Sequence, residues 1–145
     1  MIKTIYILNG PNLNLLGTRE PEIYGAATLT DIEDACAEKC KAAGYGLLFH
    51  QSNIEGEIVD QIQRAGKDGV AVLINAAAYT HTSVAIYDAL KTLRIPVIEV
   101  HISQPASRES FRQQSFIAPV ATGSISGFGT NSYLLAIDAA IDSLK

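Results

Sequence analysis

The stretch Val-Ala-Val-Leu-Ile at residues 70–74 is a continuous apolar run that ends at Asn75. A run of this length without polar alternation is typical of a strand covered on both faces, as in a parallel sheet. Comparable strand patterns recur along the chain, at residues 4–8, 46–52, 96–100 and, more weakly, 120–125. The sequence therefore predicts five strands.

Segments with helical periodicity separate these strands. Apolar residues recur at helical spacing in the segments 29–43, 54–65, 84–93 and 134–144. Thr30 and Glu33 have the Thr-x-x-Glu spacing of a capping box at the start of the first helix. Alternating strands and helices imply an α/β fold with a parallel sheet and helices on both faces. We expect a flavodoxin-like strand order, 2-1-3-4-5, and a single domain over residues 1–145.

Composition excludes several classes of function. The net charge is −4 and no Lys/Arg run is present, which argues against a nucleic-acid partner. No apolar run approaches the ~20 residues that span a bilayer, so we expect no membrane association. The N-terminus has no signal-peptide pattern, which predicts a cytoplasmic protein. Cys36 and Cys40 lie four residues apart with no nearby His, and they are expected to be reduced helix cysteines rather than zinc ligands.

Polar residues follow the predicted strands, where ligands bind in open α/β sheets. Asn12 follows the first strand, Asn75 and His81 follow the third, and His101 and Ser103 follow the fourth. Because the carboxyl ends of parallel strands meet at one edge, these side chains are expected to converge there.

The loop over residues 9–25 is longer than the usual 2–6 residues of α/β connections. It carries Gly17 and Gly25 as candidate hinges, with Arg19 and Tyr24 between them. Long loops of this kind are usually functional, so we interpret it as a lid. The alternative is a surface loop with an incidental arginine and tyrosine.

His101 is expected to share one face of a strand with Glu99, two residues earlier. A carboxylate beside an imidazole fixes its tautomer, which suits acid–base chemistry. A structural histidine bonded to a core carboxylate is the competing interpretation. His81 could equally cap the helix that begins near Ser83, and Arg112 could be a surface residue or an anchor for a carboxylate.

The chain resembles the type II 3-dehydroquinate dehydratases at five motifs spread over nearly its whole length. These are Asn9-Gly-Pro-Asn-Leu-Asn-Leu-Leu-Gly-Thr-Arg-Glu-Pro-x-Ile-Tyr-Gly25, Gln51-Ser-Asn-x-Glu-Gly-Glu57, Ala78-Tyr-Thr-His-Thr-Ser-Val-Ala-Ile-x-Asp-Ala89 with Asn75 before it, Glu99-Val-His-Ile-Ser103 and Arg108-Glu-x-Phe-Arg112. The resemblance implies reversible dehydration of 3-dehydroquinate to 3-dehydroshikimate through an enolate, without metal or cofactor. It also implies a dodecamer built from four trimers.

The resemblance assigns roles to particular residues. Tyr24 matches the general base, and Arg19 matches the lid residue that activates it. His101 matches the general acid, with Glu99 as its support, and Asn12 matches the residue that stabilises the enolate. The remaining matches imply contacts with the substrate, with Asp88 reaching the site of a neighbouring subunit: Asn75, His81, Asp88, Ile102, Ser103 and Arg112.

Three positions depart from the family pattern. Ile54 stands where many members have a histidine, residues 76–77 are Ala-Ala where Pro-Gly is common, and residues 104–106 are Gln-Pro-Ala where an Asn and often a His are expected. Two other readings compete with the enzyme: a flavin or nucleotide module on the same fold, and a non-catalytic scaffold protein. The first requires a phosphate-binding loop after the first strand, which Pro11 does not favour. The intact set of Tyr24, Arg19 and His101 argues against the second.

Overall fold

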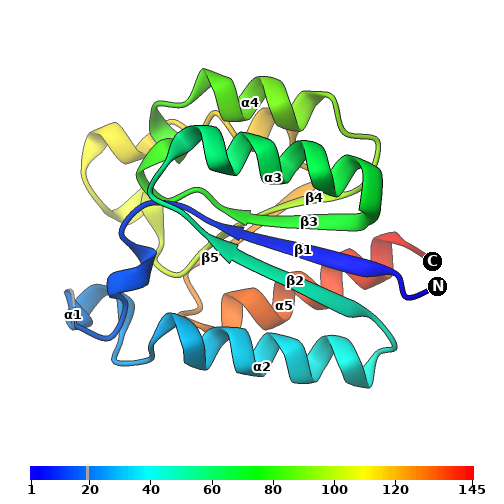
Figure 1. Cartoon of the computed structure of the whole chain (residues 1–145). Coiled ribbons are helices and arrows are strands. Elements are labelled where there is room, and N and C mark those ends of the chain that lie inside the picture. The colour runs from blue at the N-terminus through cyan, green and yellow to red at the C-terminus, as the bar shows by residue number, and fades with distance from the viewer. Residues whose placement is uncertain (19) are drawn as a thin grey trace.

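The computed structural model describes residues 1–18 and 20–145, and for Tyr24 it describes the backbone alone. Strands and helices alternate along the chain, except between β4 and β5, which are joined by a segment with three short 3₁₀ helices (Figure 1). In chain order they are β1 (Thr4–Asn9), α1 (Pro21–Tyr24), α2 (Leu29–Ala42), β2 (Gly46–Gln51), α3 (Glu55–Asp68), β3 (Gly69–Asn75), α4 (Val84–Lys91), β4 (Val97–His101), β5 (Gly123–Ser126) and α5 (Asn131–Ser143).

The five strands form one parallel sheet in the order β2-β1-β3-β4-β5. The predicted flavodoxin-like order is therefore confirmed. Residues 5–9 of β1 and residues 71–75 of β3 are buried, because each of these strands has a neighbour on both sides and helices on both faces. All five strands run in the same direction, so their carboxyl ends lie along one edge.

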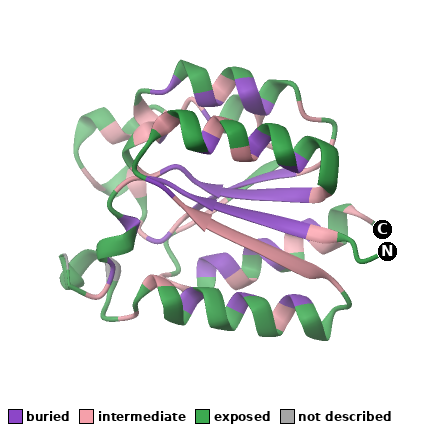
Figure 2. Ribbon diagram, in the orientation of Figure 1, coloured by how far each residue is buried: buried purple, intermediate pink, exposed green. Residues whose placement is uncertain are grey.

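Helices α2 and α5 cover one face of the sheet, and α3 and α4 cover the other (Figure 1). Successive strand residues point to opposite faces, so Leu73 packs toward α2 and α5 while Ile74 packs toward α3 and α4. The buried residues are concentrated on the central strands and the inner helix surfaces (Figure 2). Full burial of one Leu or Ile side chain contributes ~1.5–3 kcal/mol to the stability of the fold. The two clusters of buried apolar residues, one on each face of the sheet, therefore hold the sheet between its helices.

The first long helix begins at Leu29, as the apolar spacing indicated, but its capping box lies two residues earlier than predicted. The capping box consists of Thr28 and Asp31: Thr28 Oγ1 accepts a hydrogen bond from the Asp31 N–H at 3.1 Å, and Asp31 Oδ2 accepts one from the Thr28 N–H at 3.0 Å. The prediction of a box at Thr30 and Glu33 is wrong. Aspartate can close the same reciprocal pair as glutamate, and a start at Leu29 places Ile32 in the core.

The fifth strand is displaced from its predicted range. Residues 118–120 form a short 3₁₀ helix, and the strand runs from Gly123 to Ser126. Its bounds follow from its pairing with β4, and this pairing begins at Ile98 opposite Gly123 and ends at His101 opposite Ser126. This register places Ser124 opposite Glu99.

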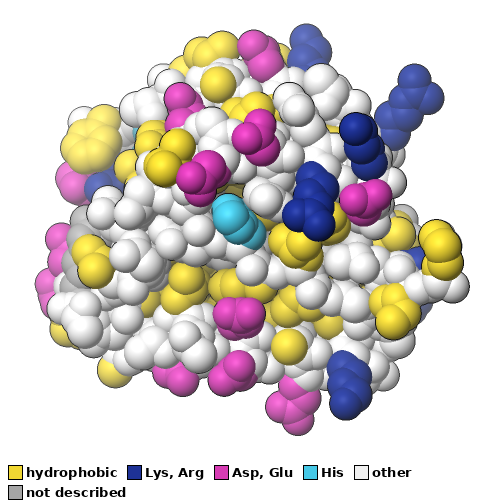
Figure 3. Space-filling model, in the orientation of Figure 1, with side chains coloured by type: hydrophobic (Ala, Val, Ile, Leu, Met, Phe, Trp, Pro, Cys, Tyr) yellow, Lys and Arg dark blue, Asp and Glu magenta, His cyan; other side chains and the backbone are white. Residues whose placement is uncertain are grey.

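Within the described part of the chain, no helix is long and apolar enough to cross a bilayer. On the face seen in Figure 3, Lys and Arg side chains are interspersed with Asp and Glu rather than gathered in one patch.

Candidate active site

A pocket opens at the carboxyl edge of the sheet, between the loops that follow β1, β3 and β4. Seven of the residues that the sequence singled out line it: Asn12, Asn75, His81, His101, Ile102, Ser103 and Arg112. They come from the last residues of β3 and β4 and from the loops after β1, β3 and β4, which are distant in the chain, and the parallel sheet brings them together.

The other singled-out residues lie elsewhere. Glu99 is buried behind His101, and Asp88 is an exposed residue of α4 that does not line this pocket. Arg19 and the side chain of Tyr24 fall outside the described residues. Gly17 and Gly25, which flank them, have φ angles of 92° and 82°, a conformation that glycine adopts without the steric cost of a side chain.

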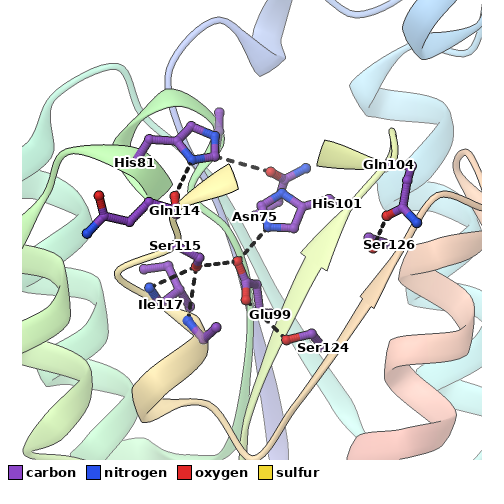
Figure 4. A network of polar contacts seen from close by, with 12 residues as sticks. Asn75, His81, Glu99, His101, Gln104, Gln114, Ser115, Ile117, Ser124 and Ser126 are labelled. Carbon is purple, nitrogen blue, oxygen red and sulfur yellow. Dashed lines mark hydrogen bonds and ion pairs between the residues drawn. The ribbon is translucent and has the colours of Figure 1, made fainter. Parts of the chain in front are cut away.

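His101 and Glu99 form a hydrogen-bonded pair at the pocket wall (Figure 4). The distance between His101 Nε2 and Glu99 Oε2 is 2.6 Å. An ionised carboxylate only accepts hydrogen bonds, so Nε2 carries the proton and Nδ1 is the ring atom left for a ligand. A protonated imidazole held in this way can donate a proton from Nδ1.

Two serine hydroxyls also donate hydrogen bonds to the Glu99 carboxylate. Ser115 Oγ donates to Oε2 at 2.7 Å and Ser124 Oγ donates to Oε1 at 3.1 Å. Burial raises the pKa of Glu99, but the hydrogen bond and the charge of His101, together with the two hydroxyls, outweigh burial and bring that pKa below its usual value. Glu99 is therefore an anion at neutral pH, although it is only 3% exposed.

His81 does not cap α4. Ser83 is the cap, because its hydroxyl oxygen accepts from the Ile86 N–H at 2.9 Å. His81 Nδ1 instead lies 2.7 Å from the carbonyl oxygen of Gln114 (Figure 4). A carbonyl can only accept, so Nδ1 carries a hydrogen and Nε2 is the atom that remains for a ligand.

The loop that carries Asn12 is held by Gln51, the last residue of β2, and by Asn53, which follows that strand. The Asn12 N–H donates to Asn53 Oδ1 at 2.9 Å, and Gln51 Nε2 donates to the Gly10 carbonyl at 3.1 Å. The Tyr79 hydroxyl donates to the Asn53 carbonyl at 2.7 Å. Asn53 thus ties the loop after β1 to the loop after β3. It keeps Asn12 in its left-handed conformation, with a φ of 69°.

Two arginines give the pocket a cationic rim. Arg112 donates from Nε to Glu109 Oε1 at 3.0 Å and lies over the Phe111 ring at 5.0 Å. Arg108 also lines the pocket and donates from Nη1 to Ser103 Oγ at 3.2 Å. Sequence reasoning missed Arg108 as a pocket residue, although its position four residues before Arg112 is compatible with a shared surface. A guanidinium rim suits a ligand with a carboxylate group.

The departure at residues 76–77 has a visible consequence. Ala77 has a φ of 52°, a left-handed conformation that glycine adopts without strain. Close by, Gly10 approaches the chain so tightly that a Cβ atom there would lie 2.2 Å from the Ala76 carbonyl oxygen. The loops after β1 and β3 are therefore in direct backbone contact beneath the pocket.

Among the described residues, no group of three or more His, Cys, Asp or Glu side chains is arranged to hold a metal ion. The polar groups of the pocket are amides, imidazoles, guanidinium groups and backbone amides. Such a set can bind a carboxylate and hydroxyl groups, stabilise an anion and transfer protons.

Comparison with known proteins agrees with this chemistry. The family model described as "Dehydroquinase class II" matches residues 3–141. The chain belongs to this family. The resemblance seen in the sequence motifs is confirmed, and the family is one of hydro-lyases.

Individual relatives cover almost the full chain. It is 57% identical over 144 residues to a 3-dehydroquinate dehydratase of Maricaulis maris, with 99% of each chain covered. The crystal structure of a type II dehydroquinase from Butyrivibrio crossotus superposes with a TM-score of 0.94 at 43% identity, covering 97% of this chain and 98% of that one. A second type II dehydroquinase structure, from Propionibacterium acnes, gives a TM-score of 0.92 at 42% identity and covers 96% of each chain.

Proposed function

We propose that this chain removes water from 3-dehydroquinate to give 3-dehydroshikimate, with residues 1–145 acting as one catalytic domain. The observation that carries the proposal is the His101–Glu99 pair at the wall of a pocket rimmed by Arg108 and Arg112. Membership of the class II dehydroquinase family supports the substrate, since relatives 57% and 55% identical to this chain are named 3-dehydroquinate dehydratase. A flavin or nucleotide module is not supported by this family.

Proton abstraction is the first step of the proposed mechanism. Tyr24 removes the proton alpha to the ketone, and the C–H bonding pair becomes an enolate. Tyrosine has an ordinary pKa of ~10, so it needs help to act as a base at neutral pH. The guanidinium of Arg19 supplies that help by favouring the tyrosinate. Asn12, held by Asn53, stabilises the enolate oxygen through water.

Loss of the hydroxyl group is the second step. The enolate oxygen re-forms the C=O bond, and the C=C pair of the enolate forms the new ring double bond as the C–O bond breaks. The departing oxygen keeps the C–O pair, takes a proton from His101 and leaves as water. Glu99 stabilises the charged imidazole before the step. Tyr24 ends protonated and His101 ends neutral, so a proton returns between them, through solvent, before the next turnover.

The remaining pocket residues orient the substrate. Arg112 and the backbone at Ile102 and Ser103 bind its carboxylate, while Asn75 and His81 bind its ring hydroxyls. Arg108 adds a second positive charge next to Ser103. Rigid placement of this kind lowers the entropic part of the barrier.

The assembly and location of the enzyme belong to the same proposal. We expect a homo-oligomer, a dodecamer of four trimers, in which Asp88 contributes to a neighbouring site. A cytoplasmic location fits the two cysteines, Cys36 and Cys40, which are both free thiols.

The test is a direct assay of the purified chain for the absorbance of the conjugated enone product, with Tyr24→Phe beside it. We expect the wild-type protein to form the enone. We expect Tyr24→Phe to lose ~10²–10⁴-fold in turnover rate, the usual contribution of a general base. Tyr45→Phe, just before β2 at the opposite edge of the sheet, is the matched control and should stay fully active. Wild-type protein that forms no enone rejects the function. Near-wild-type turnover of Tyr24→Phe rejects only the role of that residue.

A further inference from the structure

Tyr133 lies beneath the pocket, between the last residues of the two central strands. It belongs to α5 and is 0% exposed. Its hydroxyl donates to Asn9 Oδ1 at 2.6 Å and accepts from Asn75 Nδ2 at 2.9 Å. Asn9 and Asn75 are register partners in the sheet, and Asn75 lines the pocket while Tyr133 does not.

These hydrogen bonds form a chain with one possible direction. At one end Asn9 Nδ2 donates to the His50 carbonyl at 3.1 Å, and at the other end Asn75 Oδ1 accepts from the Ala77 N–H at 3.2 Å. A carbonyl cannot donate and an N–H cannot accept, so both ends have fixed polarity. The Asn9 amide is therefore oriented with Oδ1 toward Tyr133, and the tyrosine proton must point to Asn9.

The orientation of the Asn75 amide follows from this direction. Because the Tyr133 proton is engaged by Asn9, the hydroxyl oxygen meets Asn75 as an acceptor, and only Nδ2 can face it. Among the described residues, one Nδ2 hydrogen and one Oδ1 lone pair of Asn75 remain without a partner. Burial raises the pKa of Tyr133 well above its usual value, more than the Asn75 hydrogen bond lowers it, so the hydroxyl keeps the proton that sets this direction.

We propose that Tyr133 is a positioning residue that fixes the amide of Asn75, so that Asn75 presents one donor and one acceptor in set places to a ring hydroxyl of the substrate. A hydroxyl group can donate and accept at once, so it matches this pair. The inference rests on the proposed function. It extends the site from the pocket lining to a side chain on α5 that contacts Asn75 but does not itself line the pocket.

The alternative is that the Tyr133 hydroxyl only stabilises the core. Its loss leaves Asn9 Oδ1 and Asn75 Nδ2 without their partner, and buried polar groups without partners destabilise a protein whatever the site does. A positioning role predicts that loss of the Tyr133 hydroxyl weakens substrate binding, and that this effect disappears when Asn75 is absent. A purely stabilising role predicts no change in substrate binding.

The experiment compares Tyr133→Phe, Asn75→Ala and the double variant by steady-state kinetics and urea unfolding. We expect Tyr133→Phe to raise KM about tenfold, the loss expected when one hydrogen bond to substrate is misplaced, with a smaller change in kcat. In the Asn75→Ala background the same substitution should change KM by less than about twofold. Tyr6→Phe is the matched control, because Tyr6 is also buried, at 2% exposed, but packs on the other face of the sheet. The KM of this variant should equal that of wild type.

Each outcome decides the inference. An unchanged KM in Tyr133→Phe, with lowered stability alone, assigns the hydroxyl to the core and overturns the proposal. A tenfold effect that persists without the Asn75 amide also overturns it. If Tyr133→Phe does not fold, Asn9→Ala is used instead, because it removes the acceptor that fixes the direction of the Tyr133 hydroxyl. A wild-type KM in Asn9→Ala rejects the positioning role of Tyr133. Inactive wild-type protein would count against the proposed function itself, which is a different result.

Discussion

Nε2 of His101 and Oε2 of Glu99 lie 2.6 Å apart, on side chains two residues apart in β4. The strand geometry places both on one face, with the imidazole at the pocket and the carboxylate in the core. Ser115 and Ser124 complete the environment of the carboxylate from two other segments. The pair is therefore an ionised group inside the protein whose charge is balanced by donors, and this gives it a measurable pH dependence.

Glu99 should make the stability of the protein depend on acid pH. Its pKa in the folded chain is lowered, whereas a free glutamate titrates near ~4.3. The stabilisation is therefore complete above the unfolded-state pKa and is lost as pH falls through the lower folded-state pKa. Urea unfolding between neutral and acid pH should show a smaller acid-induced loss in Glu99→Gln than in wild type.

The control for this measurement is Glu38→Gln, an exposed acid of α2. Its pH dependence should match that of the wild type. If Glu99→Gln loses stability with acid as steeply as wild type, the carboxylate is not the group that His101 and the serines stabilise. The same variant should also lose activity, because the imidazole loses its anionic support.

Replacing Ala77 with glycine should stabilise the protein. The left-handed conformation at a φ of 52° costs a residue with a side chain ~1–2 kcal/mol, while glycine adds ~0.5–1 kcal/mol of unfolded-state entropy. We expect Ala77→Gly to gain about 0.5–1 kcal/mol in urea unfolding. Ala78→Gly, one residue on and without a positive φ, should lose stability. Equal losses in both variants would show that Ala77 carries no strain.

Gly10→Ala should disrupt the floor of the pocket. A Cβ at that position would lie 2.2 Å from the Ala76 carbonyl oxygen, so the loops after β1 and β3 must move apart. Overpacking of this kind costs ~1–3 kcal/mol. It should raise KM as well, because Asn12 lies on the first loop and Asn75, the last residue of β3, leads into the second. Gly56→Ala is the control: nothing lies within 4 Å of its added Cβ, and alanine favours the helix. A Gly10→Ala protein with wild-type stability and KM would refute this account of the loop contact.

The sequence predicts the fold more completely than the site. The strand order follows from alternating strand and helix patterns, and His101 and Glu99 follow from their spacing in one strand. Ser124 could not be assigned in this way, because its contact depends on the register of β5, and the apolar run before that strand suggested a different start. The direction of the chain through Tyr133 likewise depends on contacts between residues more than 50 positions apart, which no local pattern encodes.

Removal of metal ions should leave activity unchanged. The proposed mechanism uses proton transfer and fixed hydrogen bonds, and the described residues contain no group suited to hold a metal. Dialysis against a chelator followed by the enone assay tests this directly, with an unchanged kcat expected. Loss of activity that returns on adding a divalent cation would contradict a mechanism that relies on side chains of the protein alone.

Asp88 provides the test of a shared site. It is the fifth residue of α4 (Val84–Lys91), it is exposed, and it does not line the pocket of its own chain. If it reaches a neighbouring subunit, where it can pair with a guanidinium such as that of Arg19, the active species cannot be a monomer, and the proposed assembly makes it at least a trimer. Asp88→Asn should then lower activity several-fold without dissociating the assembly, as measured by sedimentation together with the enone assay. Asp142→Asn, an exposed acid near the end of α5, is the control and should have no effect. Sedimentation of fully active protein as a monomer would exclude a shared site, whereas full activity of an oligomeric Asp88→Asn would exclude only the part given to this residue.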